Sequence, residues 1–221
     1  MQGVVMQEPK EQYWDLRLSD VKDALEANNF SVSIADDTGH ANKIVGDLMS
    51  HLAVRTVARG GSTTADETGI FDTIRKNADY TLIDPFAPGL SADEKNDCMR
   101  NAFSSDLYIT GTNAVTEDGV LVNLDNTGNR VAAITFGPTY VAILVGRNKI
   151  VPDLDDAIVR VKDYAAPINA MRLGKKVPCV ATGRCSECST PDRICNTWTI
   201  TEKSRPKGRI HVILIDDDLG Y

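Results

Sequence analysis

The sequence has few histidines, no excess of positive charge and no long apolar run, and each shortage excludes a class of function. Only 3 histidines occur, His40, His51 and His211. This scarcity argues against a histidine-based catalytic triad or a histidine-rich zinc hydrolase. The formal net charge of −7 argues against general attraction to nucleic acid or anionic lipid. A local exception is the late basic cluster of Arg160, Lys162, Arg172, Lys175 and Lys176.

No segment has the features expected of a membrane span or a secretory leader. The most apolar stretch, VAAITFGPTYVAILVG, is too short to cross a bilayer and is interrupted by Gly137-Pro138. The first residues, MQGVVMQEPKEQ, lack the basic and apolar regions of a signal peptide. We therefore expect a cytoplasmic protein with no membrane or nucleic-acid partner, in which clustered cysteines favour metal or redox chemistry over a disulfide framework.

Strand and helix patterns alternate along the 221 residues. Apolar stripes at helical spacing predict helices over 18–25, 44–52, 64–76, 91–103 and 152–164. Thr64 and Ser91 have capping-box spacing to a glutamate, and Pro167 is expected to end or kink the last helix. Short apolar runs predict strands over 30–35, 54–58, 80–84, 106–110, 120–124, 140–145, 197–201 and 209–215.

This alternation predicts an α/β fold, with a mostly parallel sheet and helices on both faces. Residues 1–53 are interpreted as an N-terminal helical region of the same domain. Residues 54–221 are interpreted as the main α/β domain, which includes a small C-terminal cysteine-rich segment at 179–195.

Two polar loops follow predicted strands and are candidates for an anion site. Ligands of open α/β sheets bind outside the carboxyl ends of the strands. A strand–Gly-Gly–helix junction can present backbone amides and hydroxyls to an anion, although its spacing alone favours a tight turn with a threonine cap, since no Walker or dinucleotide fingerprint is present. An arginine fork can hold a carboxylate or phosphate, and surface loops or caps are the alternative. The candidate ligand-binding residues are Gly60, Gly61, Ser62, Thr63, Asn113, Asn126, Arg130, Asn148 and Lys149.

Glu117 is the candidate catalytic carboxylate. It lies in the loop TEDG between two predicted strands, where a desolvated carboxylate can act as a nucleophile or general base. The same letters are typical of a hairpin turn, which is the simpler interpretation from local sequence.

Four of the five cysteines lie in the stretch CVATGRCSECSTPDRIC. The spacing Cys-x5-Cys-x2-Cys-x6-Cys favours one metal site made by four thiolates, although a redox disulfide or free thiols are alternatives. Zinc and a 4Fe–4S cluster are not distinguished by the spacing, which differs from the compact ferredoxin run. The predicted ligands are Cys179, Cys185, Cys188 and Cys195, whereas Cys98 is isolated.

Several motifs together resemble the lactate-utilization (LUD) domain family, in particular its stand-alone members with a C-terminal cysteine segment. They are GGSTTADETGIFD, ITGTNAVTEDGVLVNLDNTGNRVAAITFGP, VGRNKIVPDLDDAIVRVKDYAAPINAMRL, the cysteine stretch and RIHVILIDDDLGY. The resemblance implies a fold similar to ribose-5-phosphate isomerases and CoA transferases. It also implies an association with iron–sulfur oxidoreductase subunits that oxidise lactate to pyruvate.

The resemblance bears on Glu117 as well. TEDGVL resembles the segment in which a CoA-transferase glutamate carries the acyl group. We therefore expect a protein of lactate or related organic-acid oxidation that binds a small anion at strand-end loops and a metal through its cysteines. The alternatives are an acyl-transfer or sugar-phosphate enzyme that uses Glu117, and a non-catalytic assembly subunit.

Overall fold

A parallel sheet of six strands forms the centre of the structure, a computed structural model that describes residues 8–221. The strand order is β1-β10-β7-β4-β2-β3, and neighbouring strands run parallel. The α/β fold expected from the sequence is confirmed. The strands are β1 (Ser31–Ala35), β2 (Thr56–Arg59), β3 (Thr81–Ile83), β4 (Leu107–Gly111), β7 (Tyr140–Gly146) and β10 (Ile210–Ile215).

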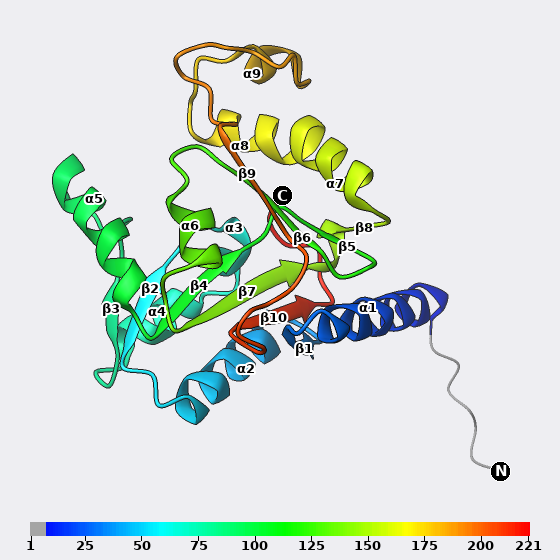
Figure 1. Cartoon of the computed structure of the whole chain (residues 1–221), viewed down its shortest axis with the longest axis vertical. Helices are drawn as coiled ribbons and strands as arrows, with labels where there is room; N and C mark the ends of the chain where they lie inside the picture. The colour runs from blue at the N-terminus through cyan, green and yellow to red at the C-terminus, as the bar shows by residue number, and fades with distance from the viewer. Residues whose placement is uncertain (1–7) are drawn as a thin grey trace.

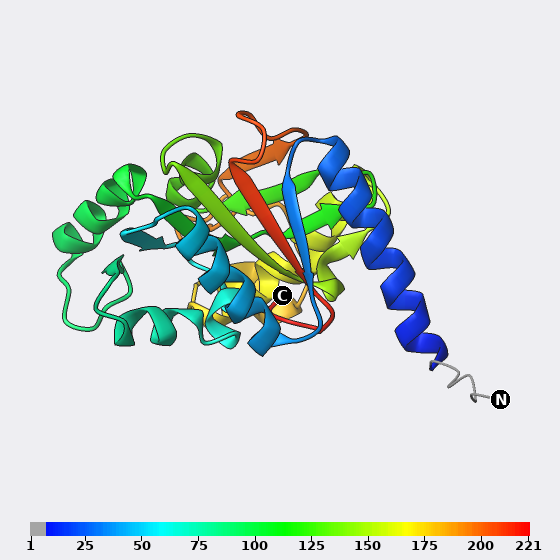
Figure 2. The ribbon, with the colours of Figure 1, turned by 90° about the horizontal axis from the view of Figure 1, so that it is seen from below.

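Helices cover both faces of this sheet (Figures 1 and 2). Val141 packs in the same cluster as α1 (Pro9–Ala27), whereas its neighbour Ala142 packs in the cluster of α2 (Thr38–His51) on the opposite face. This alternation follows from the period of two along a strand. Because both faces are buried, β7 and β10 appear in the sequence as continuous apolar runs.

A second, four-stranded sheet of order β8-β5-β6-β9 lies over the α1 face of the main sheet. Val115 and Leu121 connect it to the shared core, and its other side packs against α7 (Leu154–Arg160) through Val122 and Ala157. The second sheet therefore separates the main sheet from the late helices. Its strands are β5 (Ala114–Thr116), β6 (Leu121–Asp125), β8 (Ile150–Val151) and β9 (Thr197–Thr201).

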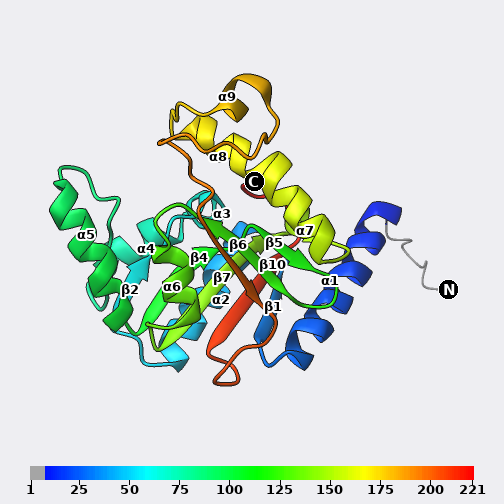
Figure 3. The ribbon, with the colours of Figure 1, turned by 45° about the horizontal axis from the view of Figure 1, so that its top comes forward.

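The predicted helix over 152–164 does not end at Pro167. Helix α7 continues through a π-helical turn at Val161–Ala165 into α8 (Ala166–Arg172), and we call this continuous element the α7–α8 rod. Proline has no N–H to donate to the preceding turn, and the irregular turn lies directly before it. Figures 1 and 3 show the rod above the sheets, with the cysteine segment beyond it.

The predicted helix over 64–76 is split in two. Gly69 has a φ of 72° between α3 (Thr63–Glu67) and α4 (Ile70–Lys76). The N-cap is Ser62, whose Oγ accepts a hydrogen bond of 3.1 Å from the Ala65 amide, so the expectation that Thr64 begins a capping box is wrong.

The other predicted capping box is confirmed. Ser91 and Glu94 cap each other reciprocally at the start of α5 (Ala92–Asn101). Two short helices were not predicted, α6 (Asn129–Thr135) and α9 (Pro178–Thr182), because neither is long enough to show a clear helical period. Within residues 8–221, no helix has the length and apolar character needed to cross a membrane.

Replacing Gly119 by alanine is expected to destabilise the fold more than the same change at Gly174. Both glycines have positive φ, so each variant carries a backbone strain of about 1–2 kcal/mol. At position 119 the new Cβ would also lie 2.7 Å from the Ala24 backbone of α1, whereas position 174 is open. Urea unfolding of both variants measures the difference, and equal losses of stability would contradict this packing.

Candidate functional site

A polar pocket of about 310 Å³ lies beside the carboxyl ends of the main-sheet strands. Loops that follow β2 and β4 provide residues 61–63 and 111–113, and Lys149 follows β7. The segment 124–130 contributes another wall, and the α7–α8 rod contributes Asn169 and Arg172. Elements distant in the sequence therefore meet around one cavity.

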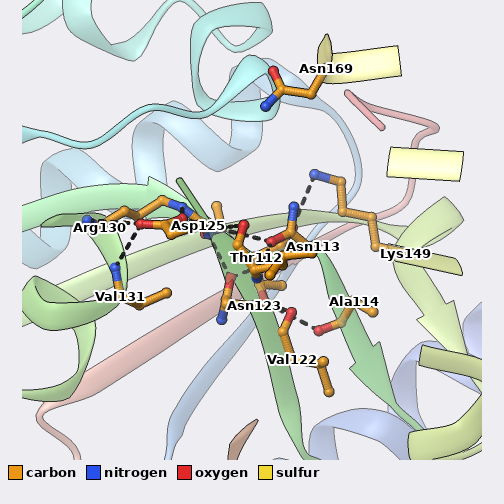
Figure 4. A network of polar contacts seen from close by, with 12 residues as sticks. Thr112, Asn113, Ala114, Val122, Asn123, Asp125, Arg130, Val131, Lys149 and Asn169 are labelled. Carbon is orange, nitrogen blue, oxygen red and sulfur yellow. Dashed lines mark hydrogen bonds and ion pairs between the residues drawn. The ribbon is translucent and has the colours of Figure 1, made fainter. Parts of the chain in front are cut away.

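Arg130 organises one wall of the pocket. Its side chain is 10% exposed, and Asp125 Oδ1 lies 2.7 Å from its Nη2. Nε donates to Asp125, and Nη1 donates to Asn123 Oδ1 and to the Gly111 carbonyl. Nη2 donates to Asn113 Oδ1 and the Leu124 carbonyl. All five N–H groups of the guanidinium thus have protein acceptors, so Arg130 acts as a scaffold beside the pocket (Figure 4).

Lys149 is the buried cation on another side of the pocket. It is 3% exposed, and its Nζ lies 2.7 Å from Thr64 Oγ1 and 3.3 Å from the Thr112 carbonyl. Burial, followed by the charges of Arg160 and Arg130, lowers the pKa of Lys149 to about 7 against an opposing effect of Glu67. An amine with this pKa changes its protonation state near neutral pH.

The charges that line the pocket favour an anion. Arg130 is neutralised by Asp125. Lys149 and Arg172 have no carboxylate within ion-pairing distance among residues 8–221. Arg172, together with the protonated fraction of Lys149 near neutral pH, therefore leaves positive charge in the pocket for a ligand to neutralise.

Most of the predicted ligand-binding residues meet at this pocket. Its lining includes Gly61, Ser62, Thr63, Asn113, Asn126, Arg130 and Lys149. Gly60 is not among the lining residues, and a Cβ there would lie 2.6 Å from the Tyr108 hydroxyl. Asn148 instead holds the chain near its C-terminus, where its Oδ1 accepts from the Leu219 amide at 3.2 Å and its Nδ2 donates to the Gly220 carbonyl at 3.2 Å.

Three further lining residues were not predicted as ligands: Asn169, Arg172 and Tyr221. Arg172 belonged to the basic cluster of the sequence, but nothing indicated that it faces a cavity. Its Nη2 donates to Asn169 Oδ1 at 2.8 Å, and that oxygen also accepts from the Tyr221 hydroxyl at 3.2 Å. The spacing of Asn169 and Arg172, three residues apart, is the one sequence signal that places both on one helical face.

Glu117 lies outside this pocket. It occupies the turn between antiparallel strands β5 and β6, and its side chain is 43% exposed. Its Oε1 lies 2.7 Å from Arg17 Nη2 on α1. The position agrees with a hairpin turn, and a catalytic role for Glu117 remains a prediction that the pocket geometry does not favour.

All four cysteines of the C-terminal segment line one small cavity of about 20 Å³. The cavity lies between α8 and the segment 177–195, and each of the four thiols is free and partly buried. Cys98 is not among its lining residues. The spacing of these cysteines therefore brings them to a common place in the fold.

Charged neighbours surround this cysteine cavity. Burial and then the other thiols raise the pKa of Cys179, and burial is also the main cause that raises the pKa of Cys195. Lys162 and Arg193 act in the opposite direction on Cys195. In the part of the chain that the structure describes, no three His, Cys, Asp or Glu side chains are close enough together to hold a metal ion.

The cysteine cavity and the polar pocket share a wall. Ala166 of the rod, Ile194 and Cys195 line both. Ile194 is 7% exposed and packs with Ala170 and Val177. The wall between the two cavities is therefore mainly apolar and includes the side chain of Cys195.

Comparison with known proteins decides the family. A model of the LUD domain matches residues 18–215, which is most of the chain. The chain belongs to the LUD domain family. This LUD-domain chain is also similar to a DUF162 family protein from Deinococcus radiodurans, with 14% identity, a TM-score of 0.50, and coverage of 91% of this chain and 97% of that chain. At this identity the likeness supports the fold alone. No curated protein matches the chain.

Replacing Arg130 by methionine is expected to destabilise the protein by about 3–5 kcal/mol, because it leaves the buried carboxylate of Asp125 without its partner. Arg172→Met serves as the control, since Arg172 is exposed and has no ion pair within the described chain. Its free energy of unfolding should change by less than about 1 kcal/mol. Denaturant titration measures both, and a mild effect at Arg130 would contradict its role as a scaffold.

Replacing Lys149 by methionine is expected to stabilise the protein most at low pH. The pKa of about 7 in the folded state lies below the value of about 10.4 for an unfolded lysine. Below pH 7 both states carry the charge, and the folded state bears the full penalty of burial. As pH rises from about 7 to about 10, the folded state loses its proton first and the penalty declines.

Unfolding free energies of wild type and Lys149→Met at about pH 6 and about pH 9 test this sign. Each unit by which folding lowers the pKa of Lys149 corresponds to about 1.4 kcal/mol of stability gained by the variant at low pH. The loss of the two hydrogen bonds that Lys149 donates reduces this gain. If the unfolding free energy of Lys149→Met, relative to wild type, increases with pH, Lys149 keeps its proton in the folded state.

Proposed function

We propose that this LUD-domain chain binds a small organic carboxylate in the polar pocket and takes part in the oxidation of lactate or a related acid in the cytoplasm. The observation that carries the proposal is the positive charge that Lys149 and Arg172 leave in a pocket beside the strand ends. Iron–sulfur oxidoreductase subunits are the partners that we propose to carry the electrons.

The pocket residues suit a hydroxy acid or oxo acid. Arg172 offers an Nη1 group that has no hydrogen-bond partner among the described residues, and a guanidinium binds a carboxylate with directional hydrogen bonds. Ser62 and Thr63 also line the pocket, and their hydroxyl groups can bond to the substituent of the acid. Asn113 is held by Arg130 and the Leu124 amide, so this side of the pocket is ordered before a ligand arrives.

Calorimetric titration with L-lactate and pyruvate tests the binding step. Wild type should bind at least one of the two acids, and Arg172→Gln should weaken binding about tenfold or more, since it removes a charge-assisted hydrogen bond. Glu117→Gln is the matched control, because its carboxylate lies outside the pocket and the change should leave affinity unaltered. Loss of binding in the Glu117 variant with normal binding in the Arg172 variant would favour the acyl-transfer alternative.

The cysteine cavity supports a second part of the proposal, a metal held by four thiolates. The donor set fits, since all four thiols line one cavity and thiolates bind zinc and iron–sulfur clusters. Lys162 and Arg193 lie close enough to offset the negative charge of thiolates. The sulfur atoms must draw together to ligate, as no three of them are at ligand spacing among residues 8–221. Zinc would supply a structural cross-link there, and a cluster would supply electron transfer.

Metal content after anaerobic purification tests this part. Wild type is expected to carry zinc or iron, and Cys185→Ser should lose it and become protease-sensitive in segment 179–195, because a thiolate site contributes local folding energy. Cys98→Ser is the control and should keep the metal, since Cys98 lies outside the cavity. Equal metal content in all three proteins would contradict a shared site.

A further inference from the structure

Lys149 differs from the other lysines near the pocket. It is the one buried lysine among the described residues. Lys162 lies 2.7 Å from Glu187, and Lys175 lies 3.5 Å from Asp192, so both are ion-paired at the surface side of the cysteine segment. Lys149 has a hydroxyl and a carbonyl as its partners instead. A buried lysine without a bonded carboxylate is not explained by structural charge pairing.

The two partners determine which part of the amine stays free. Thr64 Oγ1 donates its own hydrogen to the Leu219 carbonyl at 3.2 Å, so it accepts from Lys149. The Thr112 carbonyl also accepts from Lys149. A neutral amine has two N–H groups and one lone pair. Both N–H groups are therefore occupied by the protein, and the lone pair is left for a ligand in the pocket that Lys149 lines.

We propose that Lys149 is a carbonyl-reactive amine that forms a Schiff base with a 2-oxo acid bound in the polar pocket. The inference rests on the proposed binding of a small carboxylate in this pocket. It adds the ligand class, a 2-oxo acid, and a covalent step. Arg172 provides the positive charge for the carboxylate, and Lys149 provides the nucleophile for the neighbouring carbonyl carbon.

The step balances without an external oxidant or reductant. The Nζ lone pair attacks the carbonyl carbon, and one of the two amine protons moves to the carbonyl oxygen to give a neutral carbinolamine. Its hydroxyl takes up one proton from solvent and leaves as water, as the nitrogen lone pair forms a double bond to the carbon. The product is a protonated imine, and hydrolysis reverses the step. A 2-hydroxy acid lacks the carbonyl and binds without reaction.

The surroundings keep the amine reactive near neutral pH. Burial is the main cause that lowers the pKa of Lys149 to about 7, with the guanidinium groups of Arg160 and Arg130 next. At pH 7 roughly half of such an amine is neutral, against about one part in a thousand or less for an ordinary lysine. Lysines desolvated beside other cations are activated in this way.

Reductive trapping tests the inference. The whole protein is incubated with pyruvate and sodium cyanoborohydride, digested and analysed by mass spectrometry. Lys149 should gain the mass of the 2-oxo acid less one oxygen atom, at a rate at pH 7 about five hundredfold above that of the exposed Lys203. Labelling should be half-maximal near pH 7 and should be slowed by excess L-lactate.

Two variants and a binding measurement make the outcomes distinct. Lys149→Met should abolish the modified peptide, and Lys203→Met should leave labelling of Lys149 unchanged. Calorimetry of the same samples without reductant reports pyruvate binding. Binding without an adduct at Lys149 overturns this inference and leaves the proposed function standing. Absence of binding by both pyruvate and L-lactate overturns both, and adducts confined to exposed lysines overturn the inference.

Discussion

The buried guanidinium of Arg130 is the interaction on which the pocket depends. It links the end of β4, through the Gly111 carbonyl, to Asn123, Leu124 and Asp125 of the second sheet. Asp125 in turn accepts from the Arg130 and Val131 amides at the start of α6. One ion pair thus joins two sheets and a short helix. Its burial is tolerated because every donor of the guanidinium has an acceptor, which compensates the loss of hydration.

This arrangement separates structural charge from charge available to a ligand. Arg130 and Asp125 neutralise each other in the wall, whereas Lys149, which follows β7, and Arg172 of the α7–α8 rod line the cavity. The same rod forms the floor of the cysteine cavity, and Cys195 borders both spaces. Ile194 and Ala166 also line both the cysteine cavity and the polar pocket.

The parts predicted correctly from the sequence are those that depend on local pattern. The apolar runs of β7 and β10 and the Ser91–Glu94 cap are expressed within a few neighbouring residues. The position of Glu117 was ambiguous because a turn and a catalytic loop share the same short motif. Its pairing with Arg17 joins residues a hundred positions apart. No local pattern encodes such a contact.

The site was predicted in part for the same reason. Strand ends identified the loops at Ser62 and Asn113, since topology alone places such loops at one edge of the sheet. The saturation of Arg130 depends on five acceptors from two segments, 111–113 and 123–125, which no local sequence pattern reveals. The cavity-facing position of Asn169 and Arg172 requires the rod to continue past Pro167, which proline argued against.

A crystal structure of the chain with L-lactate would show whether the polar pocket holds an organic acid through Arg172 and Lys149. We expect the carboxylate within hydrogen-bond distance of the Arg172 guanidinium and the rest of the acid against Lys149 and the Ser62–Thr63 loop. An acid bound on the Glu117 turn or in the cysteine cavity, with the polar pocket holding water only, would contradict this expectation.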